Sequence, residues 1–175
     1  LQRLSVSARE VRTTEQLEMV DALIIPGGES TTMATLMDIY GLREPILAHA
    51  RAGKPVWGTC AGMVLLATRL VETIPTPLNL MDIVVQRNGF GRQIDSFETE
   101  FEVKDIGEAP IHGVFIRAPM VCEVGSTVEV LAQLSNGSIV AVRQGPILAT
   151  SFHPELVGDD RMHRYFLNLI PDHTP

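Results

Sequence analysis

The sequence predicts an α/β fold: a three-layer, open, mostly parallel sheet with helices on both faces and an antiparallel portion added. From residue 22 to about residue 71, short apolar runs alternate with helical patterns, the order that gives a parallel sheet covered on both faces. The second half instead holds strand patterns and a hairpin signal. With 175 residues, 45% of them hydrophobic, the chain can bury one substantial core.

The first half supplies the expected parallel strands and their helices. The run ALIIP (22–26) is a candidate strand, and STTMATLMDIYG (30–41) has the apolar spacing of an amphipathic helix. Ser30 and the threonines offer N-cap chemistry at its start, and Gly41 is placed to end it. The following segments are a helix over about 42–52 that stops at Gly53, a buried strand in KPVWGTC (54–60) and a helix in AGMVLLATRLV (61–71).

The second half supplies the antiparallel portion. SFETEFEV (96–103) alternates apolar and polar residues as a half-buried strand does, and Asn136-Gly137 between two apolar runs predicts a hairpin. ILATSF (147–152) is the last predicted strand, and the segment 153–170 contains a closing helix. We expect one domain, residues 1–175, whose N-terminal strand and helix are incomplete, because residues 1–13 are too few for both.

The overall charge and the cysteines restrict the classes of function. A formal net charge of −7 and a pI near 5.2, with scattered Lys and Arg, argue against a nucleic-acid partner. No apolar run is long enough to cross a bilayer, so a soluble, cytoplasmic protein is expected. Cys60 and Cys122 are expected to be free thiols. No cluster of ligand-type residues predicts a metal, and no cofactor is expected.

Cys60 lies in the sequence Gly58-Thr59-Cys60-Ala61-Gly62, between a predicted strand and a predicted helix. Small residues at −2 and +2 are what a sharp strand-to-helix elbow requires, because larger side chains would collide with neighbouring backbone. The elbow exposes the sulfur at a helix N-terminus, which favours the nucleophilic thiolate. The alternative is that Cys60 is a small buried apolar residue, as free cysteines usually are.

His153 and Glu155 are the candidate partners of that thiol. They follow a predicted strand, and Glu155 at i+2 projects to the same side as His153, so it could hold one ring nitrogen while the other faces Cys60. An isolated surface pair of histidine and glutamate is the alternative. The pair and Cys60 both follow predicted parallel strands, however, so they are expected at the sheet edge where such folds bind ligands.

Acyl chemistry also needs hydrogen-bond donors for an oxyanion. The elbow provides the N–H of Ala61, and the loop PGGES (26–30) exposes further N–H groups at Gly27 and Gly28. A Gly-Gly pair alone usually marks only a turn. Three elements that converge on one sheet edge are a stronger signal.

These motifs resemble those of the triad-type (class I) glutamine amidotransferases, and more closely those of the glutaminase subunits of pyridoxal 5′-phosphate synthase. The resemblance runs from about residue 11 to the end, and it is carried by PGGESTTM (26–33), GKPVWGTCAGM (53–63), RNGFGRQIDSFE (87–98), VFIRAP (114–119) and ATSFHPEL (149–156). It implies a flavodoxin-like fold and hydrolysis of the glutamine side-chain amide through a γ-glutamyl thioester.

The resemblance also implies a role for each matching residue. Cys60 is then the nucleophile, His153 the general base and acid, and Glu155 the residue that orients His153. The residues expected to contact glutamine are Gly28, Glu29, Ser30, Arg87, Ile116 and Arg117, with Gly28 and Ala61 at the oxyanion. A bidentate arginine suits the substrate α-carboxylate, although Arg87 and Arg117 could also be ordinary loop and strand-end residues.

The expected partner is a separate (β/α)8-barrel synthase subunit, within a large hetero-oligomer, that receives the ammonia. Two alternatives stay open at this point. The chain could feed ammonia to a different acceptor, although the stretch 87–98 favours the pyridoxal phosphate subfamily. It could also be a catalytically silent docking subunit, although Cys60, His153 and Glu155 are all present.

Overall fold

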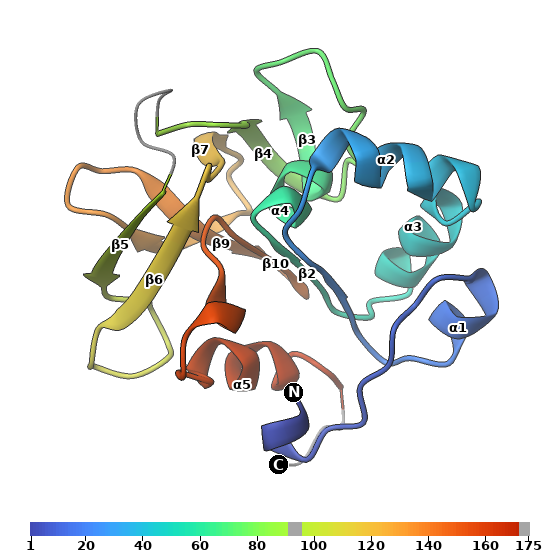
Figure 1. The fold of residues 1–175 in the computed structure, drawn as a ribbon, viewed down its shortest axis with the longest axis horizontal. Coiled ribbons are helices and arrows are strands. Elements are labelled where there is room, and N and C mark those ends of the chain that lie inside the picture. The colour runs from blue at the N-terminus through green and yellow to red at the C-terminus, as the bar shows by residue number, and fades with distance from the viewer. Residues whose placement is uncertain (91–95, 172–175) are drawn as a thin grey trace.

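The protein is described by a computed structural model over residues 1–90 and 96–171 (Figure 1). Its helices are η1 (Gln2–Leu4), α1 (Thr14–Glu18), α2 (Ser30–Ile39), α3 (Arg43–Arg51), α4 (Ala61–Leu66), η2 (Pro154–Leu156) and α5 (Arg161–Leu167). Its strands are β1 (Leu23–Ile25), β2 (Val56–Thr59), β3 (Ala67–Leu70), β4 (Met81–Gln86), β5 (Ser96–Phe101), β6 (Ile111–Ile116), β7 (Met120–Val124), β8 (Glu129–Gln133), β9 (Ile139–Gln144) and β10 (Ile147–Thr150). Among these helices none is both long and apolar enough to span a membrane.

Eight of the strands form one mixed sheet. Its order is β1-β2-β10-β9-β7-β4-β3, with β8 paired to β9, while β5 and β6 form a separate two-stranded ribbon. Strands β1, β2 and β10 run parallel to one another, as do β3 and β4, and the other neighbouring pairs are antiparallel. The predicted α/β class with an antiparallel portion is confirmed. The sheet is mixed and less parallel than predicted, because β7, β8 and β9 all pair antiparallel with their neighbours.

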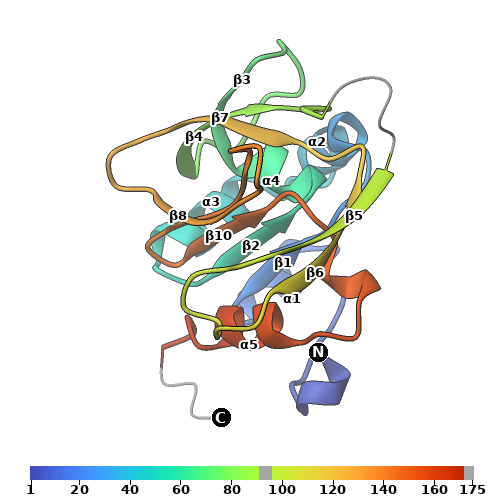
Figure 2. The same ribbon diagram turned by 90° about the vertical axis from the view of Figure 1, so that its left-hand side faces the viewer.

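Apolar side chains on the two faces of the sheet enter two separate cores. Val56 and Ile147 pack with helices α1 to α4, whereas the adjacent Trp57 packs with α5 and the β5–β6 ribbon. Figures 1 and 2 show α5 and the ribbon on the opposite side of the sheet from α2 and α3. Successive residues of a strand point to opposite faces, so both faces of β2 and β10 are buried.

The carboxyl ends of three parallel strands meet at one edge of the sheet. Ile25 at the end of β1 pairs with Gly58 of β2, and Thr150 at the end of β10 pairs with Thr59. The next residues along the chain are the 26–30 loop, Cys60 and the 151–155 segment. The fold thus brings the three predicted site segments to a common edge.

The helix predicted over 61–71 is correct only as far as Leu66, after which the chain continues as β3. The carbonyl oxygens of Leu65, Leu66 and Ala67 accept hydrogen bonds from the backbone N–H groups of residues 78, 80 and 79, respectively. These bonds satisfy the last carbonyls of the helix from outside it. A partner segment more than ten residues away therefore sets the end of α4, which local periodicity does not reveal.

Several predicted turns are confirmed by backbone geometry. Gly41 and Gly53 follow α2 and α3 with φ angles of 64° and 79°, the left-handed conformation of a helix C-terminus. Gly137 has φ 83° in the turn between β8 and β9, as the Asn-Gly signal predicted. The start of α2 was predicted wrongly, because its N-cap is Glu29 and Ser30 is already the first helical residue.

Candidate active site

Cys60 occupies a strained backbone position between β2 and α4, with φ 49° and ψ −107°. The flanking glycines make this elbow possible. A Cβ atom at Gly58 would lie 2.4 Å from the backbone carbon of Gly62, and one at Gly62 would lie 2.1 Å from the carbonyl oxygen of Ile25. Any larger residue at either position would push β1, β2 and α4 apart, so the glycine spacing that suggested an elbow has a direct steric cause.

Two backbone carbonyls fix the position of the Cys60 residue. Its N–H donates to the carbonyl of Thr150 at 2.8 Å, which ties the elbow to the end of β10. Its Sγ lies 3.8 Å from the carbonyl oxygen of Ile116, at the end of β6. The residue is only 7% exposed, so the sulfur is held in a defined place but is buried, whereas the elbow motif predicted an exposed sulfur.

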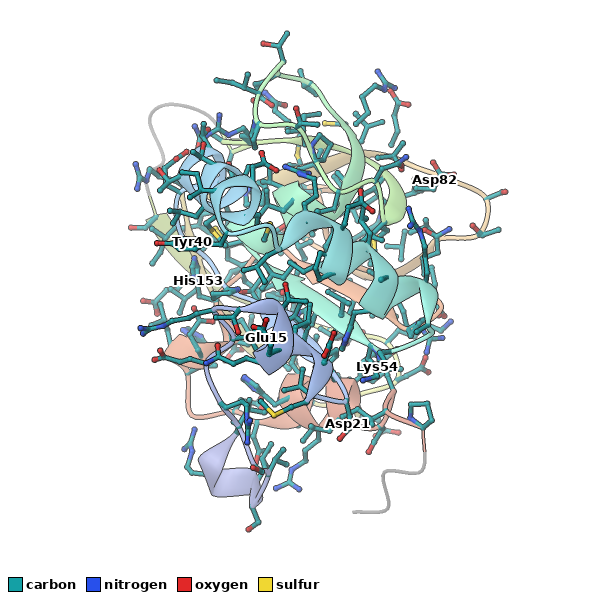
Figure 3. The ribbon with its side chains drawn as sticks, turned by 90° about the vertical axis from the view of Figure 1, so that its right-hand side faces the viewer. Glu15, Asp21, Tyr40, Lys54, Asp82 and His153 are labelled. Carbon is teal, nitrogen blue, oxygen red and sulfur yellow. The ribbon has the colours of Figure 1, made fainter. Side chains whose placement is uncertain are left out.

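His153 and Glu155 stand beside this sulfur in the arrangement that the sequence suggested. The Nδ1 atom of His153 lies 2.7 Å from Oε1 of Glu155, and the imidazole ring lies next to the Cys60 side chain. A Cβ atom at Gly27 would lie 2.4 Å from the Cε1 atom of His153 and 3.4 Å from the Cβ of Cys60. Glycine at position 27 therefore leaves room for the imidazole ring beside the Cys60 side chain. Figure 3 labels His153.

These contacts shift the pKa values of the histidine and the acid in opposite directions. The neighbouring Cys60 side chain and then the hydrogen bond to Glu155 raise the pKa of His153 to about 10, against the effect of burial. Burial is the largest single effect and acts to raise the pKa of Glu155, but the hydrogen bond to His153, a backbone hydrogen bond and nearby positive charge together outweigh it, so the pKa is lowered. At neutral pH the arrangement therefore favours an imidazolium paired with the Glu155 carboxylate.

The two predicted oxyanion donors belong to the segments that follow β2 and β1. Ala61 is the first residue of α4, where a backbone N–H has no acceptor within the helix. Gly28 follows Gly27 in the loop after β1 with φ 154°, a backbone conformation that few other residues adopt. Both N–H groups are thus carried by backbone whose shape depends on glycine.

Glu29 is the N-cap of helix α2. Its carboxylate accepts from the N–H groups of Thr31 and Thr32, at 3.1 and 2.6 Å, and from the Thr32 hydroxyl at 2.8 Å. These bonds, that from the Thr32 N–H first, lower the pKa of Glu29 to about 2. Ser30, the third residue predicted in this loop, is buried at the start of α2.

Arg87 lies at the end of β4 and reaches the same loop. Its guanidinium donates to the Glu29 carboxylate at 2.9 Å and to the carbonyl of Ile74 at 3.3 Å. Its backbone N–H donates to the carboxylate of Glu72 at 3.2 Å. Arg87 therefore connects the cap of α2 to the 71–77 segment, and the structure brings two of the predicted substrate residues into direct contact.

Ile116 is the last residue of β6, beside the thiol, and Arg117 follows it. The Ile116 carbonyl faces Sγ of Cys60, as described above, and its side chain is 39% exposed. Arg117 has φ 42° and an exposed side chain. Within residues 1–90 and 96–171, Arg117 forms neither an ion pair nor a side-chain hydrogen bond. No polar contact among these residues therefore fixes the position of its guanidinium group.

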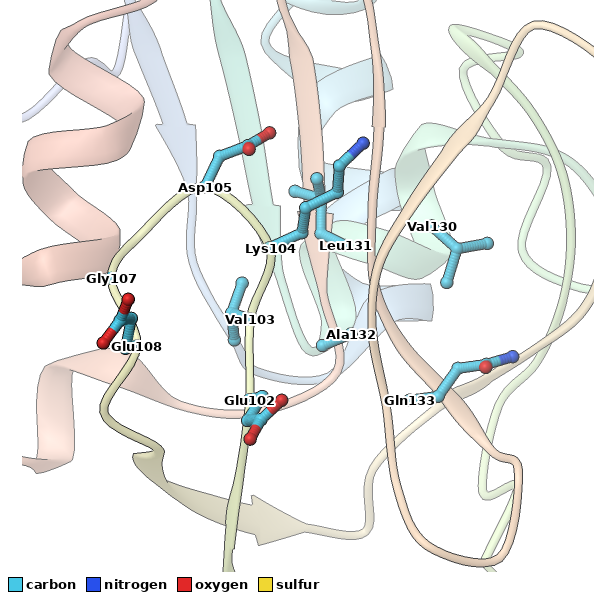
Figure 4. Close-up of a pocket in the computed structure, with 10 residues that line it drawn as sticks. All are labelled: Glu102, Val103, Lys104, Asp105, Gly107, Glu108, Val130, Leu131, Ala132 and Gln133. Atoms are coloured by element: carbon cyan, nitrogen blue, oxygen red, sulfur yellow. The ribbon is translucent and has the colours of Figure 1, made fainter.

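Two hollows of the molecule are not lined by Cys60, His153 or Glu155. One, of about 660 Å³, lies between the 102–108 segment and β8 (Figure 4). The other, of about 1250 Å³, is lined by residues 4–12, 19–26 and parts of α5. In the described part of the chain, no three His, Cys, Asp or Glu side chains gather as metal ligands would.

Comparison with known proteins identifies the family of the chain. The model of the SNO glutamine amidotransferase family matches residues 1–171. The chain belongs to the SNO glutamine amidotransferase family.

Individual relatives of this glutamine amidotransferase agree with that assignment. The chain is 57% identical over 173 residues to a pyridoxal 5′-phosphate synthase subunit PdxT of Herpetosiphon aurantiacus, covering 97% of this chain and 90% of that one. It is 56% identical over 162 residues to the PdxT of Geobacillus thermodenitrificans, covering 93% and 82%. A solved glutamine amidotransferase structure superposes with a TM-score of 0.91 at 47% identity, covering 97% of this chain and 89% of that one.

Sequence reasoning missed two contacts that shape the site of this amidotransferase. The carbonyl of Thr150 holds the N–H of Cys60, but a backbone acceptor carries no side-chain signal. The Trp57 indole N–H donates to the Thr150 hydroxyl at 3.1 Å in the core, three residues before Cys60. Trp57 is the protein's one tryptophan and directly precedes the elbow motif, and this position was the sequence signal that could have indicated the contact. Part of the 87–98 motif and His173 lie outside the described residues.

Proposed function

We propose that this chain is the glutaminase subunit of a pyridoxal 5′-phosphate synthase, hydrolysing L-glutamine to L-glutamate and ammonia. The observation that carries the proposal is the contact of Cys60 with His153 and of His153 with Glu155, built on a glycine-flanked elbow. Membership of the glutamine amidotransferase family and the PdxT relatives support the choice of glutamine as substrate.

The first half-reaction forms a thioester. The Cys60 thiolate attacks the carboxamide carbon of glutamine, and the carbonyl oxygen becomes an oxyanion that the N–H groups of Gly28 and Ala61 stabilise. The His153 imidazolium gives its proton to the amide nitrogen. The carbon–nitrogen bond then breaks and ammonia leaves, while the glutamyl group stays on sulfur.

The second half-reaction releases glutamate. His153, now neutral, takes a proton from water as the water oxygen attacks the thioester carbon. The carbon–sulfur bond breaks, and the thiolate and imidazolium are restored. Throughout, Glu155 holds Nδ1 of His153, which fixes the tautomer and stabilises the cation.

Substrate recognition is assigned to the rim of the same site. We place the glutamine α-carboxylate with the cationic groups of Arg87 and Arg117, beside Ile116 and the 28–30 loop. Glu29 already holds Arg87 in place, which reduces the ordering that substrate binding must impose on that side chain.

The ammonia is proposed to pass to a (β/α)8-barrel synthase subunit in a large hetero-oligomer. Released into water near neutral pH, ammonia becomes non-nucleophilic ammonium, so a receiving subunit would have to cover the site. The relatives' description as synthase subunits supports a partner of this kind. The free cysteines Cys60 and Cys122 fit a reducing compartment, which supports the cytoplasm as the place of action.

The test is glutamate release from glutamine by the purified protein, alone and with a pyridoxal 5′-phosphate synthase barrel subunit. Release that depends on the partner and disappears in Cys60→Ala would support both the triad and the partner. Release with no partner requirement would instead favour a different ammonia acceptor. No release under either condition would leave a silent docking subunit.

A further inference from the structure

Glu72 lies between β3 and β4 and holds the backbone of Arg87. Both oxygens of its carboxylate accept from the Arg87 backbone N–H, at 3.2 and 3.3 Å. The N–H of Val71 donates to the carbonyl of Val85, which continues the backbone ladder of β3 and β4 by one residue. Arg87 is two positions beyond Val85, so its N–H faces the same neighbouring strand. The Glu72 side chain thus supplies the acceptor for the next N–H group, at the point where β4 ends.

The segment that carries Glu72 also holds the other end of Arg87. The guanidinium donates to the carbonyl of Ile74 at 3.3 Å and to the Glu29 carboxylate at 2.9 Å. Residues 72–74 therefore contact Arg87 both at its backbone and at the tip of its side chain. Within the described residues these bonds occupy two of the five N–H donors of the guanidinium. The other donors, on a side chain that is 25% exposed, are left for a ligand.

A second arginine anchors this segment to the helices beside it. The guanidinium of Arg43, at the start of α3, donates to the carbonyls of Thr76 and Pro77 at 3.3 and 3.2 Å. The same guanidinium pairs with Asp38 of α2 at 2.6 Å. The segment is thus tied to both helices, and the carboxylate that holds Arg87 projects from a part of the chain with little freedom to move.

We infer that Glu72 is a positioning residue for the α-carboxylate of the substrate, and that it acts through Arg87. This inference rests on the glutaminase function proposed above, in which Arg87 binds that carboxylate. An arginine holds a carboxylate with two parallel N–H bonds only when its fork faces the ligand, so the direction in which the side chain leaves the backbone matters. Glu72 fixes that direction before the substrate arrives, which reduces the cost of ordering Arg87 on binding. Glu72 needs no contact with the substrate for this role.

The test compares two reagents that alkylate Cys60, in a Cys122→Ser background. One is the L-glutamine analogue in which a diazoketone replaces the carboxamide, so it presents an α-carboxylate to the site. The other is iodoacetamide, which has no α-carboxylate. Both are measured on the chain alone and with the synthase barrel subunit. In Glu72→Ala the half-saturating concentration of the diazoketone should rise about tenfold, the order expected for a lost hydrogen bond to a charged group. Its maximal rate and the rate with iodoacetamide should stay within about twofold of the wild type, because only binding is affected.

A merely structural role of Glu72 predicts a different result. If its loss only loosened the fold around the thiol, the rates with both reagents would change together, and that outcome would overturn the inference. An unchanged half-saturating concentration would also overturn it. So would a lower one, because it would mean that the charge of Glu72 repels the substrate.

Two further variants accompany Glu72→Ala. Glu72→Gln keeps an acceptor oxygen for the Arg87 N–H, so its half-saturating concentration should lie between those of the wild type and the alanine variant. It also serves as the second variant should the alanine variant fold poorly. Glu123→Ala is the matched control, because Glu123 forms an exposed 3.2 Å pair with Arg69 of the same strand β3. This control should leave the labelling by both reagents unchanged.

A double-mutant comparison shows whether Glu72 acts through Arg87. In an Arg87→Ala background, Glu72→Ala should raise the half-saturating concentration by less than about twofold, because no guanidinium is left to position. An effect as large as in the Arg87 background would overturn the inference. Absence of saturable labelling in the wild type would refute the proposed function and, with it, this inference. Saturable labelling that does not depend on Glu72 would refute this inference alone.

Discussion

Gly62 and Ile25 approach so closely that a Cβ atom at Gly62 would lie 2.1 Å from the Ile25 carbonyl oxygen. This contact joins the start of α4 to the end of β1, and thereby the Cys60 elbow to the loop that carries Gly28. The relative position of the proposed nucleophile and one proposed oxyanion donor thus depends on position 62 being glycine, which has no Cβ atom.

Gly62→Ala should therefore damage both stability and activity. Separating β1 from α4 is an overpacking change, for which we expect the free energy of unfolding to fall by about 1–3 kcal/mol. Displacement of the oxyanion donor from the thiol should lower kcat by about 100-fold. Urea unfolding and glutamate release measure the two effects. Gly158→Ala is the matched control, because nothing lies within 4 Å of the position where its Cβ would be.

Glu155→Gln should lower kcat far more than it changes KM. The amide keeps the shape of the side chain but loses the charge that stabilises the His153 imidazolium, a change for which a loss of about 10²- to 10⁴-fold is expected. Glu98→Gln is the control, because Glu98 forms an equally short 2.7 Å pair with His112 on the β5–β6 ribbon. Similar kinetics in the two variants would argue against an orienting role for Glu155.

The elbow and the proximity of Cys60, His153 and Glu155 could be predicted because their signals are local. Gly58, Cys60 and Gly62 lie within five positions, and His153 and Glu155 are two residues apart, so spacing alone indicates their geometry. The parallel strands then bring the two segments together, which follows from general rules of α/β folds.

The contacts that the sequence did not reveal join distant segments. Arg87 and Glu29 are 58 positions apart, and either could have had another partner. Both Glu29 and Ser30 are suitable N-cap candidates for α2 by sequence. In the structure Glu29 is the N-cap, and its carboxylate accepts hydrogen bonds from two backbone N–H groups. The sequence alone does not distinguish between such possible hydrogen-bond partners.

Glu29→Gln should destabilise the protein in a pH-dependent way. The pKa of Glu29 is about 2 in the folded protein, below the ordinary value of 4.5, so its stabilising effect is fully present above pH 4.5 and is lost as the pH falls through 2. The urea midpoint of the variant should therefore lie below that of the wild type at pH 7, and the two should converge in strong acid. A difference that stays constant from pH 7 downward would show that the charge of Glu29 does not act on folding.

His49 should make the stability of the protein fall in mild acid. It is buried on α3, and within the described residues its Nε2 atom has no hydrogen-bond partner. Burial, followed by the charge of Lys54, lowers its pKa, while the Pro55 carbonyl and Asp21 oppose this; Lys54 and Asp21 are labelled in Figure 3. Because the folded pKa lies below the unfolded one, the unfolded chain binds the proton first.

The stability that depends on neutral His49 is thus present above pH 6.5, the ordinary pKa of histidine, and is lost as the pH falls from there toward the folded value. His49→Gln cannot take up this proton, so the wild type should lose stability more steeply than the variant, by up to about 1.4 kcal/mol per pH unit. Urea unfolding of both proteins at intervals from pH 8 to pH 5 measures the difference. Effects of the other titrating groups cancel between the two proteins, so parallel stability curves would mean that His49 accepts its proton equally well in the folded and unfolded chain.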